Sequence, residues 1–455
     1  MSAPRDASVS VAEMLGERTD LLLRSARSNA PTFADCCEEL AALGVAKGSG
    51  IFISAPNPVL AVRLFLSSVA LGLIPCLVSP ITTADRLSVI NKHLHLMGTV
   101  RIAPPSEHRP GGPSIRLERF ERPARRFVPG STLMLTSGTS GVSTGVLHSL
   151  EQLERNARRH TSSLGLTTSD QILAVLPVYY SFGLVAQIIA PLALGVPVTL
   201  SHEIFSPAAF VGDLRACGAN VSAVTPRMAA ALVNTDRRSL ERLRVLSVGG
   251  QSCPPDVTRS LLRRQRIPQV FLTYGLTEAG PRVATLSAHA ESEQRWASIG
   301  IPLDNTTLGV DAIQGESVLT VTSDTVATSY LGRFDPTSID AKGHRRLLTG
   351  DVVRQDEDGY FSVIGRRSDI VVIGGEKILL SDVRSIAESV LGVARATVTA
   401  RTSDGEPIGL RMHLWLRDDT IDPVDVRRAI GRRLRAVERP SEVTTEVLGD
   451  NLWVK

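Results

Sequence analysis

The chain has little of what several protein classes require. Its five cysteines are odd in number and form no C-x-x-C pair, which argues against a disulfide framework or a zinc site. The first residues, Met-Ser-Ala-Pro-Arg-Asp, lack the apolar core of a signal peptide, so we expect a reducing, cytoplasmic location. The net charge is only +4, and the arginines are scattered instead of forming a run interleaved with aromatics. Nucleic-acid binding is therefore not expected.

Lysine is also scarce, and the long apolar stretches are interrupted. The chain has only these lysines: Lys47, Lys92, Lys342, Lys377 and Lys455. Residues 64–81 and 172–200 approach the length of a membrane span, but proline and glycine break both stretches. We expect buried strands and helices there, and no membrane span.

At 455 residues the chain is too long for one ordinary core, which predicts two domains. Short β-branched runs recur, and segments of helical period follow them. This alternation predicts mostly parallel sheets covered by helices. The runs are Gly50–Ser54, Ile74–Val78, Thr132–Thr136, Gln171–Leu176, Leu243–Val248 and Gln269–Thr273.

The sequence pattern changes after about residue 300, where shorter β-type runs separated by turn residues predict a small β-rich subdomain. Beyond Arg366, helical periods near Ser381–Val390 and Pro423–Val437 flank two short strands. We therefore predict an α/β fold with a large domain over residues 1–366, in which mostly parallel, helix-covered sheets are joined by the β-rich subdomain. A small, mobile α+β domain would follow over residues 367–455.

An apolar strand near residue 133 runs into a loop made of serine, threonine and glycine. Glycines let backbone N–H groups turn inward and small hydroxyls add donors, so such a loop suits phosphate. Taken alone, a cluster of this kind is as often a plain surface turn. The candidate phosphate-binding residues are Thr136, Ser137, Gly138, Thr139, Ser140 and Gly141.

Two further strands end in segments rich in glycine or hydroxyl groups, Gly249–Gln251 and Tyr274–Gly280. Open α/β sheets bind ligands at the carboxyl ends of their strands. We therefore expect one cleft to collect all three loops.

Taken in order, the chemical motifs resemble those of the adenylate-forming superfamily of acyl- and aryl-CoA synthetases, nonribosomal peptide adenylation domains and luciferases. The resemblance runs from about residue 133 to residue 375, in family order and at family spacing. The most specific parts are Tyr274-Gly-Leu-Thr-Glu278 and the block that joins Thr349-Gly-Asp351 to Arg366 and Asp369. The remaining motifs are residues 136–141, 177–183, 249–250, 298–302 and 359–361.

This resemblance implies a site for ATP. Residues 136–141 would wrap the phosphates, while Gly249, Gly250 and Gln251 would border the adenine. Tyr274 and Gly275 would also line the nucleotide site.

The resemblance also implies roles for single polar groups. Thr277 would offer a hydroxyl to the α-phosphate, and Glu278 would offer the oxygen ligand that Mg²⁺ prefers. Asp351 would accept both ribose hydroxyls, and Arg366 would contact ribose or phosphate. Ser368 would sit at the hinge about which the small domain turns between two half-reactions.

The chain departs from the family pattern at several charged positions. Lys455 is the candidate for the family's C-terminal catalytic lysine, although a solvated chain end is the alternative. Thr144 stands where the loop usually has a lysine, which predicts slower adenylation or weaker ATP binding. Tyr180 stands where members that use acyl or aryl acids commonly have a histidine, and Val372 stands where the family frequently has a lysine. Both replacements count against the second half-reaction more than against the first.

The segment predicted to hold the acid contains no carboxylate that could meet a substrate ammonium. An aryl or short acyl acid is therefore favoured over an α-amino acid, although several of these side chains could instead pack the core. The candidate pocket residues are Tyr179, Tyr180, Ser181, Phe182 and Gly183.

The predicted reaction is attack of a small carboxylic acid on the α-phosphorus of MgATP, giving an acyl- or aryl-adenylate and pyrophosphate. A thiol of CoA or of a carrier protein's phosphopantetheine would then displace AMP. An amide synthetase with an amine acceptor is one alternative. A catalytically degenerate paralogue that only binds nucleotide is another, which the missing loop lysine favours and retention of Glu278, Asp351 and Arg366 opposes.

Overall fold

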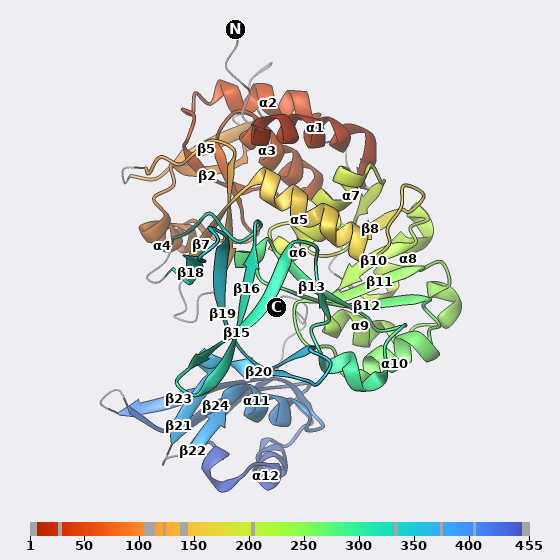
Figure 1. Cartoon of the computed structure of the whole chain (residues 1–455), viewed down its shortest axis with the longest axis vertical. Helices are drawn as coiled ribbons and strands as arrows, with labels where there is room; N and C mark the ends of the chain where they lie inside the picture. Colours follow the sequence, from red (N-terminus) through yellow and green to blue (C-terminus); the bar gives the residue numbers. More distant parts are fainter. Residues whose placement is uncertain are drawn as a thin grey trace. The chain divides into compact units, whose positions relative to one another are not determined.

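The computed structural model describes residues 7–25, 30–103, 114–121, 124–136, 144–201, 205–331, 335–373, 376–403 and 406–447. The chain forms two compact units (Figure 1). The first comprises residues 1–309, 320–349 and 355–362, and the second comprises residues 310–319, 350–354 and 363–455. The domain boundary between residues 366 and 367 stays a prediction. No helix within the described ranges is long and apolar enough to cross a membrane.

The largest sheet of the first unit has eight strands in the order β1-β9-β8-β10-β11-β12-β13-β14. Neighbouring strands from β1 to β12 run parallel, and β13 and β14 add antiparallel pairs at one edge. The predicted, mostly parallel sheet is thus confirmed. Its strands are β1 (Leu23–Ser25), β8 (Ile172–Ala174), β9 (Val198–Leu200), β10 (Val221–Val224), β11 (Val245–Gly249), β12 (Gln269–Gly275), β13 (Arg282–Ser287) and β14 (Ile301–Pro302).

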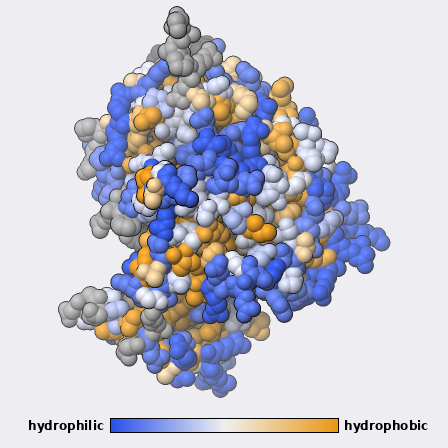
Figure 2. All heavy atoms as spheres, viewed as in Figure 1, coloured by the Kyte–Doolittle hydropathy of each residue, from blue (hydrophilic) through white to orange (hydrophobic). Residues whose placement is uncertain are grey.

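Helices cover both faces of this sheet, because alternate residues of its strands enter two different cores. Val245 packs into a core built on α1, α5 and α7, whereas Leu246 and Val248 pack into another built on α8, α9 and α10. Hydrophilic side chains predominate on the outer surface over α8–α10 (Figure 2). The helices are α1 (Ala7–Leu22), α5 (Leu150–Ser163), α6 (Ser181–Leu184), the π-helix η2 (Val185–Ile189), α7 (Ala190–Leu194), α8 (Pro207–Cys217), α9 (Pro226–Leu232), the 3₁₀ turn η3 (Arg237–Leu240) and α10 (Pro255–Arg263).

A second sheet of the first unit has the order β3-β2-β4-β5. Helix α3 is buried on all sides, which accounts for the apolar stretch near residue 64. It begins where the Asn57 side chain accepts hydrogen bonds from Val59 N and Leu60 N, with Pro58 in the first turn. The elements are β2 (Gly50–Ser54), β3 (Ile74–Leu77), β4 (Gly98–Ile102), β5 (Ile115–Arg119), α2 (Phe33–Ala42), α3 (Pro58–Ala70) and α4 (Ala84–Leu94).

The strand before the serine- and threonine-rich loop belongs to a separate sheet with the order β17-β7-β6. We expected a helix after this strand, but β6 (Ser131–Thr136) pairs antiparallel with β7 (Thr144–Ser149), which also pairs with β17 (Ser329–Leu331). Helix α5 starts only at Leu150, where Ser149 and Gln152 form a capping box. The buried run from Gly145 to His148 stabilises the chain as a strand before that cap.

The later part of the chain is rich in strands, as predicted. A five-stranded sheet has the order β15-β16-β19-β18, with β20 paired to β19. Its strands are β15 (Thr306–Ile313), β16 (Glu316–Ser323), β18 (Thr337–Ile339), β19 (Arg345–Gln355) and β20 (Phe361–Arg366). The chain also forms the 3₁₀ turns η4 (Thr277–Ala279), η5 (Glu293–Ala297) and η6 (Arg367–Asp369).

The second unit ends in the predicted α+β arrangement. Strands β23, β24 and β25 form a sheet whose buried residues share a core with α11 and α12. The elements are β21 (Ile370–Ile373), β22 (Glu376–Leu379), α11 (Leu380–Glu388), β23 (Val393–Ser403), β24 (Glu406–Leu416), α12 (Pro423–Arg433), η7 (Ala436–Glu438) and β25 (Glu442–Val447).

Candidate active site

The predicted phosphate loop is the connection of the β6–β7 hairpin. Thr136 ends β6, and Thr144 faces it as the first residue of β7. Their Oγ1 atoms lie 2.7 Å apart, and Thr144 Oγ1 lies 2.9 Å from the hydroxyl of Tyr330 on β17. The predicted residues Ser137, Gly138, Thr139, Ser140 and Gly141 lie outside the described residues. The stem of the loop is thus a chain of hydroxyl groups across three strands.

Two other predicted motifs lie side by side in the eight-stranded sheet. Strands β11 and β12 run parallel, and Gly249 is paired in register with Thr273. A Cβ atom on Gly249 would lie 2.4 Å from Thr273 Oγ1, so only glycine fits there. Gly250 has a φ of +93°, a backbone conformation that favours glycine. Gln251 is exposed at the same edge, next to the end of β12 that carries Tyr274 and Gly275.

A hydrogen bond joins the predicted nucleotide motif to the predicted acid pocket. Thr277 lies in the turn η4, and its Oγ1 is 2.8 Å from Oγ of Ser181, the first residue of α6. These residues are 96 positions apart in the sequence. The fold therefore brings together two segments whose proximity the sequence implied only through resemblance.

The remaining predicted pocket residues divide between the core and the surface. Tyr179 packs against the first hydrophobic core, while Tyr180 is 39% exposed; their ring centroids lie 4.8 Å apart. Gly183 is buried so close to the Pro177 carbonyl that a Cβ atom would lie 2.4 Å from its oxygen. Phe182 is half-buried, and a Cβ on Gly249 would touch its ring.

His148 is a functional candidate that we did not predict. It is fully buried on β7, and its Nε2 lies 2.8 Å from the carbonyl oxygen of Thr277. Because a carbonyl only accepts, Nε2 carries the proton and donates it. Burial lowers the pKa of His148 to about 4, so the imidazole is neutral near pH 7. The only signal in the sequence is a histidine inside an apolar strand.

Arg282 is a second residue that sequence reasoning missed. It is the first residue of β13, only 3% exposed, with Cζ 4.3 Å from the Phe182 ring centroid. Its Nε and Nη2 atoms have no hydrogen-bond partner, and burial lowers its pKa to about 9. Asn156 on α5 holds the backbone of Arg282, accepting from its N–H at 2.9 Å and donating to its carbonyl at 2.8 Å.

The predicted ribose-binding pair lies in the second unit. Asp351 on β19 is buried and accepts a hydrogen bond from Arg366 Nε at 2.9 Å. Arg366 is half-exposed, and Ser368 Oγ lies 3.4 Å from Asp369 Oδ1 in the turn η6. Lys455 lies outside the described residues. The roles of these residues in nucleotide binding and rotation stay predictions.

Glu278, the predicted magnesium ligand, follows Thr277 directly in η4 and is half-buried. Its backbone carbonyl accepts a hydrogen bond from Ala327 N at 2.9 Å, which fixes the turn to the segment before β17. A carboxylate and a hydroxyl on adjacent residues are oxygen donors of the kind that Mg²⁺ prefers.

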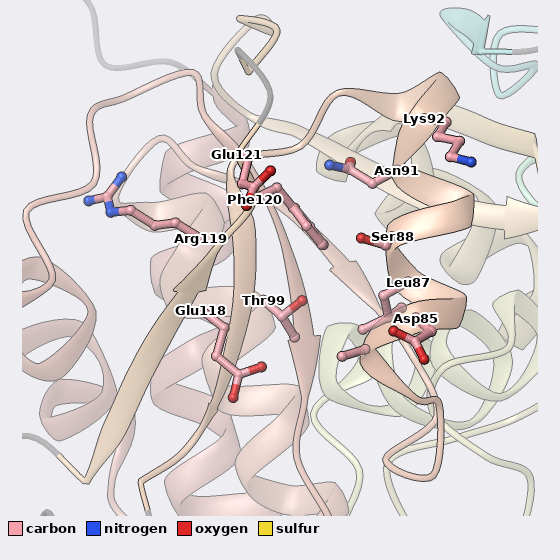
Figure 3. Close-up of a pocket in the computed structure, with 11 residues that line it drawn as sticks. Asp85, Leu87, Ser88, Asn91, Lys92, Thr99, Glu118, Arg119, Phe120 and Glu121 are labelled. Atoms are coloured by element: carbon pink, nitrogen blue, oxygen red, sulfur yellow. The ribbon is translucent and has the colours of Figure 1, made fainter.

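A separate cavity of about 450 Å³ lies between α4 and strands β4 and β5 (Figure 3). None of the predicted site residues lines it. Its charged lining residues are Asp85, Lys92, Glu118, Arg119 and Glu121.

Comparison with known proteins finds similarity to a family of nucleotide-using enzymes. Residues 123–331 match the family of AMP-binding enzymes. The chain is 29% identical to the 2-succinylbenzoate–CoA ligase of Bacillus licheniformis over 68% of its own length and 65% of that protein. It is 28% identical to the sulfoacetate–CoA ligase of Cupriavidus necator over 74% and 72% of the two chains.

Several of these relatives are longer than the region they share with this chain. The chain spans 65% of the B. licheniformis ligase and 55% of the 2-succinylbenzoate–CoA ligase of Geobacillus sp., to which it is 31% identical.

Solved structures have the same fold. The o-succinylbenzoate CoA synthetase of Bacillus subtilis, in complex with its acyl-adenylate intermediate, superposes with a TM-score of 0.76. It is 23% identical, and the match covers 95% of this chain and 94% of that one. The hairpin stem, the paired glycine ends of β11 and β12, and the Thr277 turn all lie within residues 123–331, the part of the chain that matches the family of AMP-binding enzymes.

Proposed function

We propose that this protein is an ATP-dependent acid–thiol ligase. It converts a small carboxylic acid and MgATP to an acyl- or aryl-adenylate and pyrophosphate, then passes the acyl group to the thiol of CoA or of a carrier protein's phosphopantetheine. The hydrogen bond between Ser181 and Thr277 carries this proposal, because it joins the segment predicted to hold the acid to the one predicted to hold the α-phosphate. The CoA-ligase names of the relatives support the thiol acceptor.

The residues present suit the nucleotide and its metal ion. Thr277 offers a hydroxyl to the α-phosphate, and the hairpin stem of Thr136 and Thr144 offers neutral donors to the other phosphates. Glu278 supplies a carboxylate for Mg²⁺, which when bound neutralises phosphate charge. Asp351 and Arg366 bind the ribose in this proposal.

In the first half-reaction a carboxylate oxygen of the acid attacks the α-phosphorus. A new P–O bond forms, and the bond to pyrophosphate breaks. The protein contributes orientation and charge stabilisation rather than covalent chemistry. Thr277 is held for this purpose from two sides, because His148 binds its carbonyl and Ser181 its hydroxyl.

In the second half-reaction the thiol attacks the acyl carbon and AMP leaves with the electron pair of the broken C–O bond. We propose that this occurs in the cytoplasm. The five cysteines are all free thiols, as a reducing compartment favours.

Acid-dependent ATP–pyrophosphate exchange tests the proposal. Wild type and Asp351→Asn are assayed with pools of aryl, short-chain, fatty and amino acids. We expect exchange with an aryl or short-chain pool, and roughly a 100-fold loss in the variant, since hydrogen bonds to a charged group contribute about 1.5–3 kcal/mol each.

The matched control is Asp170→Asn. Asp170 is also a buried carboxylate paired with an arginine, Arg244 at 2.6 Å, but it is not a predicted site residue. Exchange should persist in this variant at temperatures where it stays folded. Absence of exchange with every pool, in protein that binds ATP, would instead support the nucleotide-binding paralogue.

A further inference from the structure

Arg282 is a buried cation with two side-chain nitrogens that bond to none of the described residues. The side chain is 3% exposed, and neither Nε nor Nη2 has a partner. Among the described residues no carboxylate pairs with it, whereas buried Arg63 contacts Asp20 at 3.0 Å. A buried charge without a partner costs several kcal/mol, so such a residue calls for a ligand or another function.

The guanidinium lies beside the predicted acid pocket. Its Cζ stacks over Phe182, the residue that follows Ser181. On another side is Gly275, where a Cβ atom would lie 2.9 Å from Nη1 of Arg282. The absent side chain at Gly275, two residues before Thr277, therefore lets the guanidinium pack closely against the backbone at the end of β12.

The surroundings fix the position of Arg282, and a neighbouring histidine adds a third nitrogen without a partner. Asn156 binds both backbone polar groups of Arg282, so the start of β13 is held against α5. His160, also on α5, is fully buried, and its Nδ1 has no partner. Burial and the charge of Arg282 lower the pKa of His160 well below its usual value. A neutral imidazole beside the guanidinium does not compete for an anion.

We propose that Arg282 binds a second anionic group of the acid substrate, so that the enzyme activates one carboxylate of a dianionic acid and holds the other group, a carboxylate or sulfonate, at the guanidinium. The assignment rests on the proposed function, because it deepens the substrate class of the same site. Nε and Nη2 lie on one edge of the guanidinium and have no partner, so in this proposal they are the two donors of a bidentate contact with a planar carboxylate.

Pairs of acids that differ only in the second group test this inference. The probes are succinate against succinamate, glutarate against glutaramate, and isophthalate against 3-carbamoylbenzoate, each assayed by pyrophosphate exchange with wild type and Arg282→Met. Wild type should prefer a dianionic member by at least about tenfold in kcat/KM. In the variant, kcat/KM should fall roughly 100-fold for that dianionic acid and about threefold or less for its amide, since truncating one partner of a buried charge pair costs about 2–5 kcal/mol.

Two further variants keep the result interpretable. Arg282→Lys retains the positive charge but lacks the planar guanidinium that makes two parallel hydrogen bonds. It should therefore recover part of the preference for the dianionic acid over its amide. Arg295→Met is the matched control, because Arg295 also lies over a ring, 4.4 Å from the Tyr360 centroid, but pairs with Glu291 and Asp358. Its preference should equal that of wild type, and thermal unfolding should find every variant folded.

The possible outcomes separate this inference from the proposed function. Wild-type exchange that is as fast with the amides as with the dianions overturns the inference and leaves the ligase intact. An equal loss on both members of each pair in Arg282→Met, with a raised KM for ATP, also overturns it and assigns Arg282 to the nucleotide. No exchange with any acid at all contradicts the ligase itself.

Discussion

At the scale of single residues, buried polar groups without partners gather around the predicted site. His148 and His160 each keep an unpaired Nδ1, and Arg282 keeps two unpaired nitrogens. His148 contacts Thr277, and the charge of Arg282 acts on His160. Strongly shifted pKa values of this kind are more frequent at functional sites than in ordinary cores.

His148 gives a prediction about stability against pH. Its pKa is about 4 in the folded protein and 6.5 as a free side chain, so the unfolded chain binds the additional proton between these values. The folded state therefore keeps its full stability with respect to His148 above pH 6.5, and this contribution is lost as the pH falls toward 4. From pH 7 to pH 5 the free energy of unfolding should drop by about 2 kcal/mol through His148, and His160 should act in the same direction.

Urea unfolding at pH 7 and pH 5 measures this effect in wild type and His148→Gln. The glutamine amide can still donate to the Thr277 carbonyl but does not titrate. Between pH 7 and pH 5, the free energy of unfolding should fall by about 2 kcal/mol less in the variant than in wild type. An equal loss in both proteins would contradict a neutral, buried His148.

At the scale of elements, the β6–β7 hairpin carries one of the departures from the family pattern that the resemblance predicts. The position of the usual loop lysine is taken by Thr144, which lies within a hydroxyl chain between Thr136 and Tyr330. The hairpin stem therefore presents neutral hydroxyl groups at that position.

Restoring the cation should strengthen phosphate binding. In Thr144→Lys we expect the KM for ATP to fall or the exchange rate to rise by about tenfold, because charge-assisted hydrogen bonds contribute about 1.5–3 kcal/mol and part of this is offset by the lost hydroxyl chain. Exchange kinetics at fixed acid concentration measure both parameters. Thr168→Lys, at an exposed threonine outside the hairpin, controls for added charge. Unchanged kinetics in Thr144→Lys would refute the role assigned to this position.

At the scale of the whole molecule, the proposed reaction divides into two half-reactions, and the C-terminal lysine is assigned only to the first. Lys455→Ala should reduce pyrophosphate exchange by roughly 100-fold, since loss of one group that stabilises transition-state charge typically costs 10²–10³ in rate. Thioester formation from a supplied acyl-adenylate and CoA should stay within about twofold of wild type. The two assays are run side by side on the same preparation.

Lys342→Ala removes another lysine, exposed in a turn between β18 and β19, and should leave both assays unchanged. Equal activity of Lys455→Ala and wild type in both assays would show that the family's lysine role is not carried by this residue.

The sequence by itself determined the features that depend on neighbours along the chain. Short β-branched runs located β2, β6 and β12 to within a few residues, because the residues that favour an extended strand are neighbours along the chain. The motif series was readable for the same reason. Each motif is a continuous segment whose glycines and hydroxyls serve one turn.

Only the tertiary structure decided which distant groups meet. The partnership of His148 with Thr277 spans 129 positions, and that of Asn156 with Arg282 spans 126. The antiparallel partner of β6, the burial of His148 and the unpaired guanidinium over Phe182 have no local signature, because sheet pairing and desolvation depend on what packs against a residue in space. In the sequence Arg282 resembles any other arginine, and only the fold shows it buried with no carboxylate partner among the described residues.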